Sequence, residues 1–261
     1  MLRVKDIIKL LEEKFPTSLA YDWDNVGLQI GDIMGEVKKI MVALDVTTPV
    51  VDEAIRKGVD LIIAHHPFIF SPLKSIDLKT PQGKNIQKLL KNDITVYTIH
   101  TNYDVAPGGM NDVLAKAIGL ENVLPFAMID DVHGLGRVGK LKQSIEVSEL
   151  IQLMQKTFAL NGMNYTTGDH LVETVAVIGG SGGKYIHEAR AVGADVLITG
   201  DITYHTAIDA KEIGLILLDI GHYAEIMMQD AVCDLLKAAF EKVDIGKSSA
   251  KNPISTYIFK S

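Results

Sequence analysis

The chain has 261 residues, of which 47% are hydrophobic and 23% charged, so it is long enough for one large domain or two modest ones with a sizeable core. Its formal net charge of −7, without a block of lysines and arginines, argues against binding to duplex nucleic acid. The single cysteine, Cys233, excludes an intrachain disulfide and predicts a reducing, cytoplasmic location. No apolar stretch reaches the length of a membrane span, so we expect no membrane association.

The first half of the chain alternates short apolar runs with segments of helical period. It opens with a helix pattern over residues 1–15, in which Ile7, Ile8, Leu11 and Phe15 share one face. Apolar runs and amphipathic helices then alternate over residues 39–46, 48–58, 60–66, 85–92, 94–100 and 109–119. Buried runs that alternate with amphipathic helices predict βαβ units and a mainly parallel sheet.

The same rhythm restarts after residue 125. Apolar runs are found at 135–141, 173–180, 195–201 and 215–219, with helical patterns at 147–158, at 185–193 and from about His222 onward. We therefore expect an α/β protein with two similar α/β lobes and mainly parallel sheets. The N-terminal lobe is expected over residues 1–125 and the C-terminal lobe over 126–261, with the closing helix free to pack back on the first lobe.

The two halves also align with each other at a constant offset. Gly58 falls opposite Gly193 and Asp60 opposite Asp195 in this alignment, and a second constant offset places Asp104 opposite Glu225. Glycine followed by x-Asp before a strand is a common helix-to-strand turn. The pattern is therefore open to two interpretations, a duplication or a chance similarity of two βαβ units.

Polar side chains follow the predicted strands where those strands end. They are Asp45, His65 and His66, His100 with Asp104, Asp201 with His205, and Asp219 leading into His222 and Glu225. Ligands of open α/β sheets bind outside the carboxyl ends of the strands. Because five of the eight histidines fall at or just after these ends, we interpret them as parts of one functional site.

Imidazole and carboxylate groups together predict a site for divalent ions of the Mn, Fe, Co, Ni or Zn class. His222 and Glu225 are three residues apart and share one face of a helix start. His65 and His66 would point to opposite sides of a regular strand, but Pro67 ends the strand and lets both face one cavity. Each ion of a pair then takes one of the two histidines, as in two-metal hydrolases.

Each signal also has an ordinary explanation. A His-His pair is common as a hydrogen-bonded loop feature, and His-x-x-Glu is common by chance. The glycine-rich turn over 179–183 fits either a phosphate site at a helix N-terminus or simple backbone clearance. The loop of Trp23, Asp24 and Asn25 lies outside the periodic segments and carries the only tryptophan of the chain.

Six motifs, in this order and spacing, resemble the NIF three-like proteins, often called GTP cyclohydrolase 1 type 2 homologs. They are "WDNVGLQIG", "DLIIAHHPFIF", "IHTNYDVAPGGMND", "GRVGKL", "GADVLITGD" followed by His205, and "DIGHYAEIM". The resemblance implies two lobes with two metal ions in the cleft between them, and usually a ring-shaped homohexamer. It also implies that His65, His66, Asp104, His222 and Glu225 are the metal ligands. The chain has no room for the domain that some members carry between the halves, so it resembles the short form.

The resemblance predicts a metal-dependent hydrolase of the cyclohydrolase type, acting on a nucleotide or a related ring amide or phosphoester. We expect two divalent ions of the Zn, Fe or Mn class per chain and a small-molecule substrate. His100 and His205 are our candidates for proton transfer, because a residue near the metals must protonate the leaving group. The alternative is a non-catalytic ring scaffold that binds metal or a partner.

Overall fold

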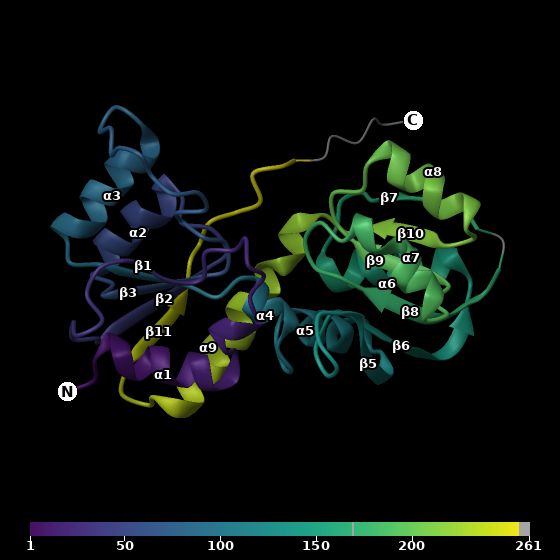
Figure 1. Cartoon of the computed structure of the whole chain (residues 1–261), viewed down its shortest axis with the longest axis horizontal. Helices are drawn as coiled ribbons and strands as arrows, with labels where there is room; N and C mark the ends of the chain where they lie inside the picture. The colour runs from purple at the N-terminus through teal and green to yellow at the C-terminus, as the bar shows by residue number, and fades with distance from the viewer. Residues whose placement is uncertain (169, 256–261) are drawn as a thin grey trace. The chain divides into compact units, whose positions relative to one another are not determined.

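The computed structural model describes residues 1–168 and 170–255. The chain forms two compact units, each with its own sheet and core (Figure 1). The first unit holds residues 1–106 and 228–251, and the second holds residues 107–227 and the segment that begins at Asn252. This division differs from the lobes expected over residues 1–125 and 126–261 in two segments: residues 107–125 belong to the second unit, and residues 228–251 belong to the first.

The first unit is built on a five-stranded sheet in the order β1-β4-β3-β2-β11. These strands are β1 (Gly27–Ile30), β2 (Lys39–Ala43), β3 (Leu61–Ala64), β4 (Thr95–Thr98) and β11 (Asp244–Lys247). β4, β3, β2 and β11 run parallel, and only β1 is antiparallel, against β4. The mainly parallel sheet predicted from the sequence is confirmed for this unit, and its inner strands are apolar on both faces because helices cover both.

Helices pack on both faces of this sheet. They are α1 (Val4–Lys14), α2 (Thr48–Lys57), α3 (Pro81–Lys91), α4 (Thr101–Val105), α9 (Met228–Ala239) and the short 3₁₀ turn η1 (Thr17–Leu19). α2 and α3 lie on one face, and α1 and α9 on the other (Figure 1). Of the four residues predicted to share one face of α1, Ile7, Leu11 and Phe15 are buried, whereas Ile8 is half-buried.

The second unit has a six-stranded sheet in the order β5-β6-β8-β9-β10-β7. Its strands are β5 (Glu121–Met128), β6 (Gly134–Ile145), β7 (Asn164–Tyr165), β8 (Val172–Val177), β9 (Val196–Thr199) and β10 (Ile216–Asp219). Only β8, β9 and β10 are parallel, while β5, β6 and β7 pair antiparallel. The prediction of a mainly parallel sheet is therefore wrong here. β5 and β6 are joined by a short turn, and a short turn can join only antiparallel strands.

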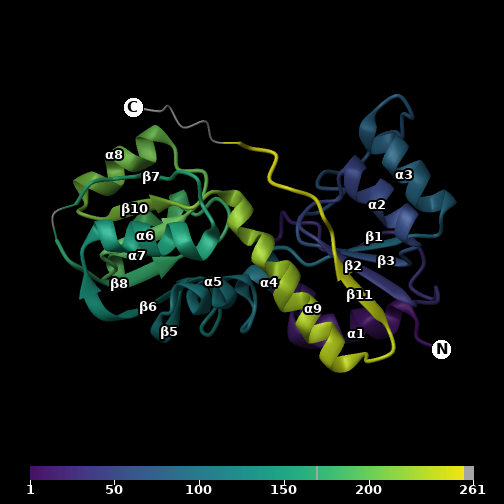
Figure 2. The same ribbon diagram turned by 180° about the vertical axis from the view of Figure 1, so that it is seen from behind.

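The helices of the second unit are α5 (Met110–Ile118), α6 (Val147–Phe158), η2 (Gly183–Tyr185), α7 (Ile186–Ala191), α8 (Tyr204–Glu212) and η3 (His222–Met227). α5 packs against α6, and α7 packs against α8. The closing helix predicted from about His222 begins as η3 and continues as α9, which packs on β11 and β2 of the first unit's sheet (Figure 2).

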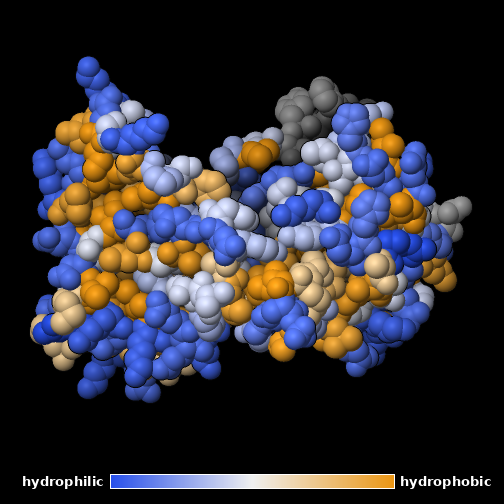
Figure 3. Space-filling view, in the orientation of Figure 1, coloured by the Kyte–Doolittle hydropathy of each residue, from blue (hydrophilic) through white to orange (hydrophobic). Residues whose placement is uncertain are grey.

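The molecular surface mixes charged and apolar side chains. Apolar residues show between hydrophilic ones over α2, α3 and the neighbouring strands of the first unit (Figure 3). Single exposed apolar side chains, such as Leu90 on α3, are ordinary on protein surfaces. Within the described part of the chain, no helix is both long and apolar enough to span a bilayer.

Candidate metal centre

The register of the first unit brings the polar strand ends together. Ala43, Ala64 and Thr98 are aligned across β2, β3 and β4, so the residues that follow them are neighbours at one edge of the sheet. The backbone N–H of His65 donates to the Ala43 carbonyl, and that of His66 donates to the Leu44 carbonyl. One ring nitrogen from each of His65, His66 and His100 lies within 4.8 Å of the others.

An oxygen atom holds the Nδ1 of each of these three rings. His65 Nδ1 lies 2.9 Å from the carbonyl oxygen of Ile99, which can only accept, so Nδ1 donates. His66 Nδ1 lies 2.8 Å from Asp45 Oδ1, and His100 Nδ1 lies 2.9 Å from Asp24 Oδ1. In a neutral ring, this proton on Nδ1 leaves the lone pair on Nε2, the arrangement that metal-binding histidines use.

Asp104 comes to the same place from α4. This short helix begins directly after β4, and the backbone N–H of Asp104 donates to the His100 carbonyl. Its Oδ1 lies 3.5 Å from Nε2 of His65, and both side chains are buried. Burial of a carboxylate is costly unless a positive charge or hydrogen bonds compensate it, so this pair is a candidate for a bound cation.

The second unit repeats this layout at β8, β9 and β10. β9 pairs in register with β8 and β10, so the three loops after these strands meet at one edge of the sheet. Gly200 donates to the Gly180 carbonyl across two of them. The carboxylate of Asp219 joins the loop after β9 to the loop after β10, because it accepts from the N–H groups of Ile202 and Gly221.

His222 and Glu225 lie in η3, directly after this edge. His222 Nδ1 is 2.7 Å from Asp201 Oδ2, and its Nε2 is 3.2 Å from Glu225 Oε2. The His222 side chain is 40% exposed, whereas that of Glu225 is only 3% exposed. Asp201 adopts a left-handed backbone conformation with φ of 55°, which aspartate tolerates better than most residues and which is common at functional sites.

The glycine-rich turn after β8 lies directly against Glu225. A Cβ atom at Gly180 would lie 2.8 Å from Glu225 Oε1 and 3.3 Å from His222 Nε2. The N–H groups of Gly179 and Gly182 donate to the side chains of Asn111 and Thr199. These contacts support the interpretation of this turn as backbone clearance, because only glycine leaves room for the carboxylate.

The loop of Trp23, Asp24 and Asn25 contacts the His100 side of the first unit, because the Asp24 carboxylate lies against Nδ1 of His100. The Asp24 carboxylate also accepts from the backbone and the hydroxyl of Thr101. Burial alone would raise the pKa of Asp24, but the hydrogen bonds from His100 and Thr101 outweigh it and hold that pKa below its usual value. The carboxylate is therefore ionised and able to orient His100.

The two residues predicted to transfer protons lie in different surroundings. His100 joins His65 and His66 in one group of ligand atoms. His205 is exposed near the start of α8, where its ring packs edge-on against Tyr204. His205 belongs to none of the ligand groups found among the described residues.

The orienting carboxylates are the part of the site that sequence reasoning left without a role. The sequence marks Asp45 and Asp201 only as polar residues at strand ends, and Asp24 only as part of a loop. The available signal was their position, because each strand-end carboxylate precedes its histidine by one βα unit. The two pairs are both 21 residues apart.

The donor set fits a metal ion of the predicted class. Ligand atoms about 2.1 Å from one ion lie about 3.0 Å apart in octahedral and about 3.4 Å apart in tetrahedral geometry. The 3.5 Å between His65 and Asp104 and the 3.2 Å between His222 and Glu225 are close to these values. Each unit thus carries its own cluster of imidazole and carboxylate groups with ligand-like spacing.

The Duf34/NIF3 family (NGG1p interacting factor 3) matches this chain over residues 2–253. The chain belongs to this family. A GTP cyclohydrolase 1 type 2 homolog from Clostridium acetobutylicum is 36% identical over 99% of both chains, and one from Lactococcus lactis is 38% identical over 97% and 98%. The resemblance stated from the six motifs is therefore confirmed.

Solved structures of the family match the fold. A Bacillus cereus protein related to NIF3 has a TM-score of 0.91 at 30% identity and covers 98% of this chain and 99% of its own. Reduced HcgD from Methanocaldococcus jannaschii has a TM-score of 0.82 at 32% identity, with 95% and 98% covered. The alignments with the Clostridium acetobutylicum and Lactococcus lactis relatives span 266 and 257 residues and nearly the whole of both chains, so the present chain is a member without an inserted domain.

Proposed function

We propose that this chain is a metal-dependent hydrolase in which His65, His66, Asp104, His222 and Glu225 hold two divalent ions. One observation carries the proposal: an oxygen atom fixes Nδ1 of each of the three histidines, which assigns the lone pair to Nε2. Purely structural histidines have no need of this arrangement, which occurs here in three rings at two strand ends. Such outer partners orient metal-binding histidines and raise their basicity.

The ligand types favour ions of the Zn, Fe or Mn class. Three imidazoles with two carboxylates suit a borderline ion better than calcium or magnesium, which prefer oxygen ligands. Two such ions, when bound, supply Lewis-acid polarisation of a substrate oxygen and activation of water. This chemistry suits the hydrolysis of a phosphoester or a ring amide, as the name of the curated relatives, GTP cyclohydrolase 1 type 2 homolog, also indicates.

Within this proposal, His100 transfers a proton through its Nε2 atom. The buried Asp24 carboxylate holds Nδ1 of this ring and fixes its orientation, so Nε2 can transfer a proton to a leaving group. His100 is the better supported of the two proton-transfer candidates, because His205 has no contact that orients it toward a ligand group among the described residues.

The test begins with protein purified without added metal. Its metal content is measured, and the native ions are used in a screen of nucleotides, phosphoesters and cyclic amides. We expect close to two ions per chain and turnover of at least one substrate. The His66→Ala variant should lower turnover by at least about 100-fold, because one ligand of the pair is lost.

His187→Ala is the matched control, since His187 is exposed on α7 and should keep full activity. Metal-loaded wild type that hydrolyses nothing in the screen would contradict the hydrolase and favour a metal-binding or partner-binding scaffold. Equal activity of His66→Ala and wild type would exclude His66 from the site.

The family resemblance also leads us to propose a homo-oligomer, with a hexamer as the expected state. Light scattering at micromolar concentration measures this directly. A monomer under these conditions would refute the homo-oligomer but would leave the proposed metal site of the individual chain unaffected.

A further inference from the structure

Three exposed or half-exposed aromatic rings stand next to the histidine group of the first unit. The rings of Tyr21 and Trp23 are stacked, with centroids 5.7 Å apart and an angle of 10° between their planes. The Trp23 ring also lies 6.0 Å from the ring of Phe70 and 6.1 Å from that of His100. Trp23 and Phe70 are each 55% exposed. We call Tyr21, Trp23 and Phe70 the aromatic platform.

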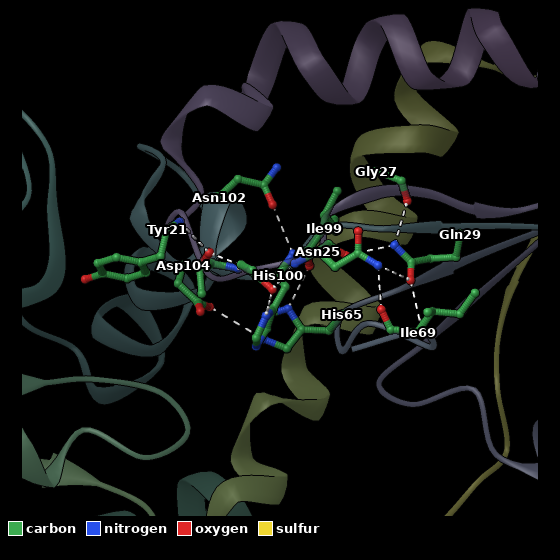
Figure 4. Close-up of polar contacts among 12 residues, drawn as sticks. Tyr21, Asn25, Gly27, Gln29, His65, Ile69, Ile99, His100, Asn102 and Asp104 are labelled. Atoms are coloured by element: carbon green, nitrogen blue, oxygen red, sulfur yellow. Dashed lines mark hydrogen bonds and ion pairs between the residues drawn. The ribbon is translucent and has the colours of Figure 1, made fainter. Parts of the chain in front are cut away.

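Hydrogen bonds from both sides hold the platform in place. Asp24 binds His100 and Thr101, and the N–H of Tyr21 donates to the Thr101 hydroxyl. On the other side, the Asn25 side chain donates to the Ile69 carbonyl, and the N–H of Ile69 donates to the Gln29 side chain (Figure 4). The loop that carries Trp23 and the loop that carries Phe70 are therefore tied together and to His100.

Such a fixed arrangement is unusual for aromatic side chains that remain exposed to solvent. Large aromatic rings stabilise a fold most when they are buried, whereas Trp23 and Phe70 leave more than half of their surface exposed. A rigid, exposed ring costs little further entropy on binding, so it is suited to recognise a ligand.

We propose that the aromatic platform binds a planar heteroaromatic ring of the substrate by stacking. This inference rests on the proposed function for its chemistry, because the ring would carry the group that reacts beside His65, His66 and His100. The 6.1 Å between the rings of Trp23 and His100 sets the scale: a bicyclic base stacked on Trp23 spans that distance. Stacking on aromatic side chains recognises the face of a base.

The size of the exposed surface favours a small ligand over a second protein chain. Aromatic side chains bury about 150–250 Å² each, so two rings that are half exposed offer on the order of 200 Å². A stable protein interface needs about 800 Å² from each partner. A surface of this size suits one small ring system, which stacks on Trp23 and meets the Phe70 ring at an angle, because the two ring planes are inclined by 54°.

Trp23 reports on this binding directly, because it is the only tryptophan of the chain. Its fluorescence is measured during titration of the full-length protein with guanosine, adenosine and ribose, with and without bound metal. We expect saturable quenching by a purine nucleoside and none by ribose. Absence of saturable quenching by any nucleoside would overturn the proposal.

Variants then separate ring stacking from general damage. Trp23→Leu and Phe70→Leu should weaken nucleoside binding in calorimetry by roughly 5- to 100-fold, whereas Trp23→Phe, which keeps a ring, should stay within about threefold of wild type. Ile76→Ala is the control, since Ile76 is an exposed apolar residue outside these ring contacts. Equal loss in Trp23→Phe and Trp23→Leu would refute stacking.

The readouts distinguish this inference from the proposed hydrolase. Quenching by a nucleoside, without turnover of any substrate in the screen, would support the aromatic platform and reject the hydrolase. Turnover with the same KM in Trp23→Leu and wild type would support the hydrolase and reject the aromatic platform. A change in molar mass of Trp23→Leu in light scattering would assign the platform to contact with a second copy and overturn the ligand proposal.

Discussion

The two units of this chain use one arrangement twice and place different side chains on it. β2, β3 and β4 in the first unit and β8, β9 and β10 in the second are three parallel strands in the same order. Asp60 accepts from the N–H groups of the two residues at 38 and 39, and Asp195 accepts from those at 173 and 174. Gly58 and Gly193 both adopt the left-handed conformation.

The strand ends of the two units differ. Where the first unit has the adjacent His65 and His66, the second has Gly200 and Asp201. The first unit therefore supplies a largely buried group of imidazoles, whereas the second supplies one half-exposed imidazole, His222, beside a buried carboxylate. The repeated hydrogen bonds build the scaffold, and the residues that follow the ends of the strands decide the chemistry.

The largest expected effect comes from removing one ligand carboxylate in each unit. Asp104→Asn and Glu225→Gln keep the side-chain volume but remove the negative charge, so each should lower the metal content by at least one ion per chain. Inductively coupled plasma mass spectrometry on dialysed protein measures this. Full occupancy in either variant would remove that residue from the ligand set and leave the comparison one-sided.

The orienting carboxylates test whether both units hold their histidines in the same way. Asp45→Ala in the first unit and Asp201→Ala in the second should each weaken metal binding by roughly 10- to 100-fold, because loss of the outer partner loosens ring orientation and tautomer. Competition with a chromogenic chelator gives the affinities. Asp209→Ala, on the exposed face of α8, is the control and should bind metal as wild type does.

Gly180, in the turn after β8, allows a finer test, with Gly58 of the first unit as a control of similar φ. Gly58 and Gly180 have φ of +62° and +59°, so alanine at either costs roughly 1–2 kcal/mol in backbone strain. Among the described residues, an added Cβ atom at Gly58 meets none within 4 Å, whereas one at Gly180 meets Glu225. Denaturant unfolding should show the larger loss in Gly180→Ala, and only this variant should lose metal. Equal effects on both measures would mean that Glu225 moves aside without cost.

The smallest effect concerns a contact that has no counterpart among the described residues of the second unit. Glu53 on α2 is buried and binds Lys57 and the N–H of Ser249. Burial alone would raise the pKa of Glu53, but these hydrogen bonds outweigh it and keep that pKa below 4.5. The stabilisation is present above about pH 4.5 and is lost as the pH falls through the lowered folded-state pKa.

Glu53→Gln should therefore lower the free energy of unfolding by about 1–2 kcal/mol at pH 7 and by much less near pH 3. Urea unfolding at both pH values measures the difference. Glu188 occupies the aligned position on α7 and is exposed, so Glu188→Gln should change little. A loss for Glu53→Gln that is the same at both pH values would exclude the carboxylate charge as the cause.

The amino-acid sequence by itself determined the elements and the edge of the sheet where the site lies. Apolar runs and helical periodicity give β2, β3, β8, β9 and β10 with their intervening helices, because these depend on local spacing. The spacing of His222 and Glu225 likewise sets them on one face, since three residues make about one helical turn. The six motifs were sufficient to place the chain in its family.

Only the tertiary structure decided the direction of β5 and β6 and the partner of each histidine. The residues of β5 had been interpreted as a boundary between lobes, because pairing direction depends on a turn and not on periodicity. Asp24 is 76 residues from His100 in sequence, and no local pattern links them. These contacts exist because parallel strands bring residues from separate βα units to one edge of a sheet, where register rather than sequence distance decides which side chains meet.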